Sequence, residues 1–218
     1  MVGQRIKQIL STLPSTVSLC AVSKYHPAEM IQEAYDAGQR IFGESHVQEL
    51  QQKHAILPGD IQWHFIGHLQ TNKVKYLIGK IELYHSCDRD ELAEEIARRS
   101  KNAGIRSNIL IQVNVGNEET KGGYDYDTAK AVFTRLSKTE GLCVKGFMAM
   151  LPASDDETLL RALTRKMRAL FEWAKTQSTA VEYLSMGMSG DYRLCIEEGS
   201  NVIRVGSTIF GKREYAKE

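Results

Sequence analysis

Short apolar runs alternate along the chain with segments in which apolar residues recur at helical spacing. The apolar runs are rich in β-prone residues and end at glycine or polar residues, which is typical of buried strands. Strands are predicted at about residues 17–23, 40–42, 61–66, 81–86, 108–115, 142–150, 181–185 and 201–205. Helices are predicted at about residues 4–12, 28–37, 46–54, 70–78, 89–102, 127–138, 156–177, 190–198 and 207–215.

This alternation of strands and helices favours parallel strands, and the number of strands favours a closed barrel. We therefore predict an α/β fold, a single (β/α)8 TIM-type barrel. A doubly wound open sheet is the alternative that the same alternation allows. No linker, low-complexity segment or internal repeat divides residues 1–218, so one domain is expected.

Composition and charge argue against several classes of protein. Hydrophobic residues make up 42% of the chain and charged residues 25%, as in soluble globular proteins. The formal net charge of +1 gives no general attraction to nucleic acid or to an anionic membrane. No apolar stretch approaches the ~20 residues of a membrane span, and the charged first turns lack a secretory pattern. We therefore expect a cytoplasmic protein without nucleic-acid or membrane partners.

Metal-binding and redox motifs are weak in this sequence. The four cysteines are widely spread and form no Cys-x-x-Cys pair, so buried free thiols are expected. His64 and His68 are four residues apart, but Gly67 and the strand context argue against one helical face carrying both. The lysines within residues 73–80 form only a modest basic stripe. Neither a metal site nor a nucleic-acid site is favoured.

A lysine follows the first predicted strand. Residues 17–22 are mostly apolar, and they lead through Ser23 into Lys24. A lysine at the exit of a buried strand lies at the rim of the core, where burial can lower its pKa and expose a nucleophilic amine. An ordinary surface lysine fits the same local pattern. The meaning of Lys24 therefore depends on the groups that the other strand ends bring beside it.

Polar and glycine residues gather at those other strand ends. In a barrel of this type the carboxyl ends of the strands form the active face. Besides Lys24, the residues predicted there are Glu44, Ser45, His64, Gly67, Ser86, Asn114, Met148, 185–189 and 204–207. Loops are enriched in such residue types in general, so this set alone does not identify a ligand.

Two neighbouring loops in this set have the form of anion-binding turns. The segment Ser185-Met186-Gly187-Met188-Ser189-Gly190-Asp191 leaves a strand and opens a helix, so its backbone N–H groups can face an anion. Arg204-Val205-Gly206-Ser207-Thr208 repeats the arrangement after the last strand. Each loop alone also fits a tight strand–helix turn, but the pair matches the usual phosphate site of these barrels.

Arg204 adds a fixed positive charge to this end of the barrel. Arg204 lies two residues before Gly206, so it would point into the barrel mouth if Gly206 does. The alternative is a structural salt bridge with Glu197 or Glu198. An electrophilic cofactor that carries a phosphate and binds Lys24 as a Schiff base accounts for the lysine and both loops together. Pyridoxal phosphate is the obvious candidate.

Seven motifs then resemble a known family. The segment Trp63-His64-Phe65-Ile66-Gly67-His68-Leu69-Gln70-Thr71-Asn72-Lys73 is similar to the signature of the YggS-like pyridoxal phosphate homeostasis proteins. The other motifs, at residues 21–24, 42–44, 112–114, 146–148, 185–191 and 204–211, fall in the family's order. The resemblance spans nearly the whole chain. It implies a barrel like the N-terminal domain of alanine racemase, with pyridoxal phosphate as an internal aldimine on Lys24.

The resemblance also implies roles for particular residues. The cofactor-binding set is Lys24, Asn114, Met148, Ser189, Arg204, Gly206 and Ser207. The phosphate would lie among Ser189, Gly206 and Ser207, and Arg204 would lie beside the pyridine nitrogen. His64 would line the same mouth as Asn114 and Met148.

The sequence departs from the family pattern after Glu44. The family usually reads Gly-Glu-Asn-Tyr or similar, whereas this chain has Ser45 and His46 at the last two positions. Ser45 can still hydrogen-bond, with a shorter reach. His46 is either a substitute polar group or a residue that starts the following helix.

Two functions remain for such a site. The first is a non-catalytic protein that holds pyridoxal phosphate, maintains its free pool and hands it to apo-enzymes that depend on it. The second is a racemase or related amino-acid enzyme of low activity that uses the same Lys24. The carrier is favoured because arginine stays protonated, so a pyridine nitrogen facing Arg204 is left unprotonated and is a weak electron sink. The family resemblance implies a monomer.

Overall fold

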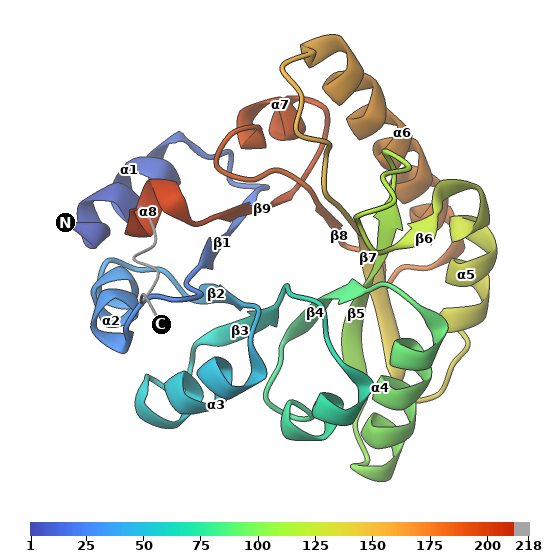
Figure 1. Ribbon diagram of the computed structural model, residues 1–218, viewed down its shortest axis with the longest axis horizontal. Helices are drawn as coiled ribbons and strands as arrows, with labels where there is room; N and C mark the ends of the chain where they lie inside the picture. The colour runs from blue at the N-terminus through green and yellow to red at the C-terminus, as the bar shows by residue number, and fades with distance from the viewer. Residues whose placement is uncertain (212–218) are drawn as a thin grey trace.

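The computed structural model describes residues 1–211, and eight of the strands in this range close a parallel barrel (Figure 1). The barrel strands are β1 (Ser18–Val22), β2 (Ile41–Glu44), β3 (Gln62–Phe65), β4 (Leu83–Cys87), β5 (Ser107–Asn114), β7 (Leu142–Ala149), β8 (Tyr183–Ser185) and β9 (Val202–Val205). Neighbours pair in the order β4-β3-β2-β1-β9-β8-β7-β5, and a further pairing of β4 with β5 closes the ring. The predicted barrel is confirmed, and the open sheet is wrong.

Helices form an outer ring around the strands, as Figure 1 shows. They are α1 (Val2–Thr12), α2 (Ala28–Asp36), α3 (Val47–Ile56), α4 (Asp90–Asn102), α5 (Ala129–Leu136), α6 (Glu157–Gln177), α7 (Tyr192–Glu197) and α8 (Ser207–Phe210). The predicted last helix at residues 207–215 begins as expected, and its part beyond residue 211 lies outside the described residues. Within residues 1–211, no helix is both long and apolar enough to cross a membrane.

Two connections differ from the prediction. The segment expected to be an α-helix at residues 70–78 is a 3-10 helix, η1 (Thr71–Tyr76), because only Val74 in it is buried and too little apolar surface is present to hold a longer helix. Residues 116–126, which lie between a predicted strand and a predicted helix, contain a short strand, β6 (Tyr124–Asp125). It pairs with the end of β5 and leads into the 3-10 turn η2 (Tyr126–Thr128).

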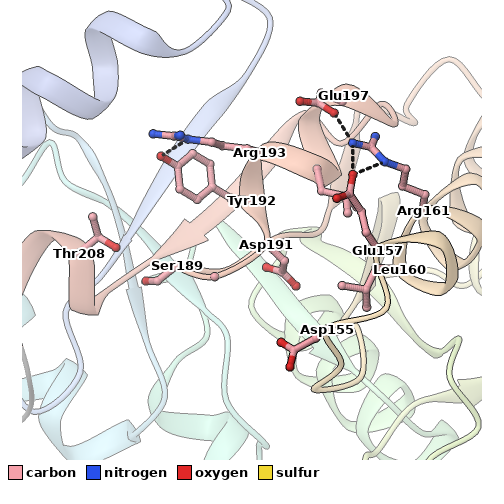
Figure 2. A pocket seen from close by; sticks show the side chains of 12 residues that line it. Asp155, Glu157, Leu160, Arg161, Ser189, Asp191, Tyr192, Arg193, Glu197 and Thr208 are labelled. Carbon is pink, nitrogen blue, oxygen red and sulfur yellow. Dashed lines mark hydrogen bonds and ion pairs between the residues drawn. The ribbon is translucent and has the colours of Figure 1, made fainter.

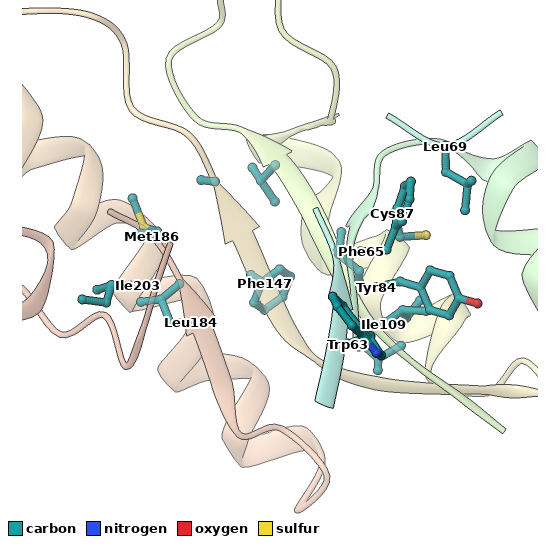
Figure 3. Close-up of a cluster of buried hydrophobic side chains, with 14 of the residues drawn as sticks. Trp63, Phe65, Leu69, Tyr84, Cys87, Ile109, Phe147, Leu184, Met186 and Ile203 are labelled. Atoms are coloured by element: carbon teal, nitrogen blue, oxygen red, sulfur yellow. The ribbon is translucent and has the colours of Figure 1, made fainter. Parts of the chain in front are cut away.

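Alternation of side chains along the strands separates the main core from the barrel interior. On β3, Trp63 and Phe65 belong to the large apolar cluster between the strands and the helices, and His64 lies between them. Figure 3 shows part of this cluster, with Phe147 of β7 and Leu184 of β8. The main apolar core is therefore the layer between the sheet and its helices, which fixes the strands and leaves the interior positions open to other residue types.

The interior of the barrel is unusually polar. A small separate cluster of Leu83, Leu110 and Met148 fills part of it. Buried polar side chains occupy neighbouring strand positions, namely His64, His85, Gln112, Ser185 and Arg204. Buried polar groups are normally hydrogen-bonded. His64, His85, Ser185 and Arg204 bond to one another in series, whereas Gln112 donates to the Gly122 carbonyl oxygen.

Candidate functional site

Lys24 follows β1 at the carboxyl end of the barrel, where the prediction places it. β1 pairs with β2 on one side and with β9 on the other, so the lysine lies beside the ends of both strands. Its side chain is half-buried. The next residue, Tyr25, has φ of 65°, a left-handed conformation that is uncommon for a residue with a side chain. Such a conformation persists only where the surrounding contacts hold it.

A buried ion pair supports the turn that carries Lys24. Lys53 of α3 donates to the Glu44 carboxylate at 2.7 Å and to the Ser23 carbonyl oxygen at 2.8 Å. The Ser23 hydroxyl donates to the same Glu44 oxygen at 2.6 Å, and Glu49 pairs with Lys53 at 2.7 Å. These bonds tie the end of β1 to the end of β2 and to α3. They fix the peptide immediately before Lys24.

Glu44 is electrostatically unusual. Burial raises the pKa of its carboxyl to about 7, although Lys53 and Ser23 act in the opposite direction. Its Oε2 atom is buried and has no hydrogen-bond partner among residues 1–211. The carboxyl therefore exchanges its proton near neutral pH in the fold.

Arg204 lies buried at the ends of three strands. Its Nη1 donates to the Ser185 carbonyl oxygen at 2.9 Å and to the Ser185 hydroxyl at 2.5 Å, and its Nη2 donates to the Ala149 carbonyl oxygen at 3.1 Å. Within the described part of the chain no carboxylate forms an ion pair with it, and burial lowers the pKa of its guanidinium. Glu197 and Glu198 pair with Arg161 instead. A buried, uncompensated cation of this kind favours an anionic or electron-rich ligand.

The two predicted anion loops border one pocket. A hollow of about 570 Å³ is lined by Ser189 and Thr208 on one side, as Figure 2 shows, and by residues of α6 and α7 on the other. Within α8, the N–H groups of Ile209 and Phe210 bond to the Gly206 carbonyl oxygen, which leaves the first helical amides, those of Ser207 and Thr208, without an intrahelical acceptor. Ser189 and Thr208 thus bring both loops to the same hollow. Binding of an anion by Ser189, Gly206 and Ser207 stays a prediction.

The first of these loops is held tightly against α7. Gly187 has φ of 99°, and a Cβ atom there would lie 2.7 Å from the Cα atom of Tyr192. The Met188 amide donates to the Asp191 carboxylate at 2.6 Å. Asp191 is thereby committed to the turn.

Asn114 and Met148 differ from each other in their surroundings: Asn114 bonds to a loop, and Met148 lies in the barrel interior. The Asn114 side chain donates to the carbonyl oxygens of Glu118 at 2.8 Å and Lys121 at 3.0 Å, and it accepts from the Glu118 amide at 3.1 Å. These bonds order the loop after β5. Met148 is buried in the barrel interior with Leu83 and Leu110. Both lie towards the carboxyl ends of their strands, and their contact with a cofactor stays a prediction.

His64 was predicted to line the barrel mouth with Asn114 and Met148, and this prediction is wrong. Its Nδ1 bonds to His85 Nε2 at 2.8 Å, and the ring lines a pocket with residues at the strand starts, such as Ser18, Ile41 and Tyr183. It therefore lies towards the amino-terminal face, opposite Lys24. The register of β3 decides this, because a short strand in a tilted barrel does not bring each of its residues to the mouth.

His46 starts the following helix, which was one of the two interpretations of this residue. It is the N-cap residue of α3, and its Nε2 lies 3.1 Å from the Tyr25 hydroxyl. Ser45 is half-buried beside it, and its role stays open as a prediction. Gly67 follows β3, and a Cβ atom there would lie 2.5 Å from the Ser45 carbonyl oxygen, so a residue with a side chain does not fit at this position.

Replacing Asn114 with alanine is expected to loosen the loop at residues 115–121. Three hydrogen bonds are lost, so we expect a decrease of about 1–3 kcal/mol in the free energy of unfolding. Hydrogen exchange measured by mass spectrometry is expected to rise in this loop. Asn108→Ala, near the opposite end of β5, is the matched control and is expected to leave the exchange of this loop unchanged. Equal exchange in both variants would contradict the role given to Asn114.

Two buried residues that support the site, Lys53 and His85, were not predicted from the sequence. Lys53, which resembles a solvated helix lysine in the sequence, is buried, and His85 is completely buried. Their sequence signal was weak, because neither stands at a strand end. The described residues contain no group of three His, Cys, Asp or Glu side chains that could hold a metal ion.

The fold and the site define a class of protein. The parallel barrel has a lysine after its first strand, a buried arginine in its last strand and a glycine- and serine-rich loop after each of its last two strands. An amine, a cation and N–H groups are the kinds of group that bind pyridoxal phosphate. Residues 2–214 match the family model described as "Alanine racemase, N-terminal domain". The alanine racemase of Clostridium difficile has the same fold with a TM-score of 0.77 at 14% identity, and this chain spans 57% of it.

The chain belongs to the family of the pyridoxal phosphate homeostasis proteins. The family member from Aquifex aeolicus is 43% identical over 90% of this chain and 87% of its own length. The structure of PipY from Synechococcus elongatus superposes with a TM-score of 0.91 at 36% identity, covering 97% of this chain and all of PipY. A second structure of PipY, with pyridoxal phosphate bound, has a TM-score of 0.87 at 35% identity.

Proposed function

We propose that this protein binds pyridoxal 5'-phosphate and maintains the intracellular supply of that cofactor. The bound form of PipY and the names of the relatives support this function. Lys24 Nζ holds the aldehyde carbon as a Schiff base, with loss of one water molecule. Hydrolysis or exchange with another amine returns the cofactor. Holding pyridoxal phosphate in this form also affects amino-acid and keto-acid metabolism through the free cofactor pool.

The main support for this proposal is that Lys24, Arg204 and two donor-rich loops all lie at the same face of one barrel. Ser189, Gly206 and Ser207 bind the phosphate through hydroxyl and backbone N–H groups. Arg204, fixed by Ser185 and Ala149, lies beside the pyridine nitrogen. Asn114 and Met148 border the same end of the barrel. When bound, the cofactor supplies an electrophilic carbon and an electron-withdrawing ring.

The protein is a carrier without catalytic turnover of its own. An arginine guanidinium donates hydrogen bonds and stays protonated, so the ring nitrogen beside Arg204 stays unprotonated and withdraws electrons weakly. Apo-enzymes that depend on pyridoxal phosphate are the recipients. The protein acts as a monomer in the cytoplasm.

Incubation of the cofactor-loaded protein with a panel of L- and D-amino acids is expected to show no robust multiple turnover. Chiral chromatography measures racemisation, and absorbance measures exchange of the cofactor onto the added amine. Exchange without product accumulation supports the carrier. Steady product formation that is lost in Lys24→Ala would contradict it and would establish the alternative, a racemase-type enzyme of low activity.

A further inference from the structure

A chain of buried hydrogen bonds crosses the barrel interior beneath Arg204. Arg204 Nη1 lies 2.5 Å from the Ser185 hydroxyl, His85 Nδ1 lies 3.0 Å from the same hydroxyl, and His64 Nδ1 lies 2.8 Å from His85 Nε2. These four side chains come from β9, β8, β4 and β3, and each is buried.

The lower end of this chain opens into a second pocket. A cavity of about 250 Å³ at the starts of the strands is lined by His64 together with Gln62, Glu82, Asn108, Lys145 and Glu182. Lys145 and Glu182 pair at 2.8 Å, and Asn108 Nδ2 donates to the Glu82 carbonyl oxygen. His64 is only 5% exposed, and no side chain or carbonyl oxygen of the described residues bonds to its Nε2 atom. That nitrogen therefore faces the pocket.

Arg204 determines the direction in which protons are donated along this series of hydrogen bonds. Arginine can only donate, so the Ser185 oxygen accepts from Arg204. The single hydroxyl proton of Ser185 then has one acceptor within the described residues, His85 Nδ1. A neutral His85 with a bare Nδ1 carries its proton on Nε2 and donates it to His64 Nδ1.

Because His64 Nδ1 accepts the proton of His85, the neutral His64 ring carries its own proton on Nε2, towards the second pocket. The opposite direction would leave the Ser185 hydroxyl proton without an acceptor in the interior, which costs stability. Burial also disfavours a charged ring in either histidine, because it lowers the pKa of His64 to about 3 and that of His85 well below its ordinary value. Both rings are therefore neutral, with the same tautomer.

We propose that His85 and His64 are positioning residues that act through Ser185 to hold the Arg204 guanidinium at the barrel mouth. They form a one-way hydrogen-bond chain between the cofactor site and the pocket on the opposite face. The inference rests on the proposed function, because Arg204 is placed beside the cofactor there. His85 keeps the Ser185 hydroxyl turned away from Arg204, so that the serine oxygen is always available as an acceptor.

The direction of the chain is tested in the protein without cofactor. Two-bond 1H–15N correlation spectra of 15N-histidine-labelled protein at pH 7 are expected to show both His64 and His85 as the neutral Nε2–H tautomer. The variants His64→Gln and His85→Asn assign the signals. An Nδ1–H tautomer or a charged ring at either position would overturn the proposal. This result does not depend on whether Lys24 binds the cofactor.

The positioning role is tested by a pair of variants. His85→Leu removes the acceptor for Ser185 and is expected to weaken pyridoxal phosphate binding about tenfold, with a shifted absorbance of the bound cofactor. His85→Asn places an amide oxygen at the Nδ1 position and is expected to restore binding to within about twofold. The exposed His54→Leu is the control and is expected to bind as the unchanged protein does.

Equal weakening in His85→Leu and His85→Asn, or no weakening in either, would overturn the positioning role. Urea unfolding of each variant shows that the comparison is made between folded proteins. If borohydride traps no cofactor on Lys24 of the unchanged protein, the proposed function fails, whereas the tautomers of the two histidines still decide whether the chain exists.

Discussion

Replacing Lys24 with alanine is expected to abolish the covalent attachment of pyridoxal phosphate completely. The side-chain amine is the nucleophile in the proposed Schiff base, and alanine has none. Borohydride reduces the Schiff base to a stable amine, so digestion and mass spectrometry locate the modified peptide. In the unchanged protein we expect the label on the peptide that contains Lys24.

Non-covalent binding is expected to persist in part in Lys24→Ala, because Ser189, Ser207 and Arg204 still offer donors for the phosphate and the ring. Loss of the covalent label is therefore the decisive measurement. Lys75→Ala, at an exposed position of η1, is the matched control and is expected to be labelled normally. Label on a lysine other than Lys24 in the unchanged protein would contradict the site.

The order of strands and the residues that follow them were predictable from the sequence, for a physical reason. Parallel strands joined by helices all end on the same face, so Lys24 after β1 and Arg204 at the end of β9 come together whatever the details of packing. The glycines and serines of residues 185–191 and 206–207 mark tight turns by their local chemistry. Local patterns of this kind carry over directly into the fold.

The interior contacts were not predictable in the same way. His64 was expected at the mouth, but its position along the barrel axis depends on the stagger between β3 and β4, which no local pattern encodes. Lys53 resembles an ordinary helix lysine, and it is buried only because α3 packs its side against the end of β2. The 3-10 conformation of η1 likewise reflects how little of it is buried.

The buried pair of Lys53 and Glu44 connects the stability of the barrel to the cofactor site. The ends of β1 and β2 meet at Ser23 and Glu44, and Lys53 bonds to both. Holding the peptide of Ser23 also holds the start of the turn at Lys24 and the left-handed Tyr25. A change in this pair should therefore appear both in the stability of the protein and in the labelling of Lys24.

The pH dependence follows from the raised pKa of Glu44. Its carboxyl has an ordinary value of 4.5 and a value of about 7 in the fold, so the folded protein keeps a proton that the unfolded chain releases. Stability from this group is therefore present below about pH 4.5 and falls as the pH rises to about 7. Glu44→Gln is expected to remove this fall, as measured by urea unfolding between pH 4.5 and 8.

Replacing Lys53 with methionine is expected to lower the free energy of unfolding by about 3–5 kcal/mol at pH 8, because the buried Glu44 carboxylate loses its partner. The loss is expected to be smaller at pH 5, where Glu44 is protonated in the fold. Labelling of Lys24 by cofactor and borohydride is expected to slow as the turn loosens.

Two further variants make the measurement specific to the pair. In the double variant Glu44→Gln with Lys53→Met, the additional loss at pH 8 is expected to disappear, because the fully buried Glu44 carboxylate is no longer present to lose its partner. Lys75→Met, on the exposed surface, is expected to leave stability unchanged at both pH values. A loss in Lys53→Met that is the same at pH 5 and pH 8 would show that the charge of Glu44 does not depend on Lys53. The support of Lys24 would then come from the shape of the turn alone.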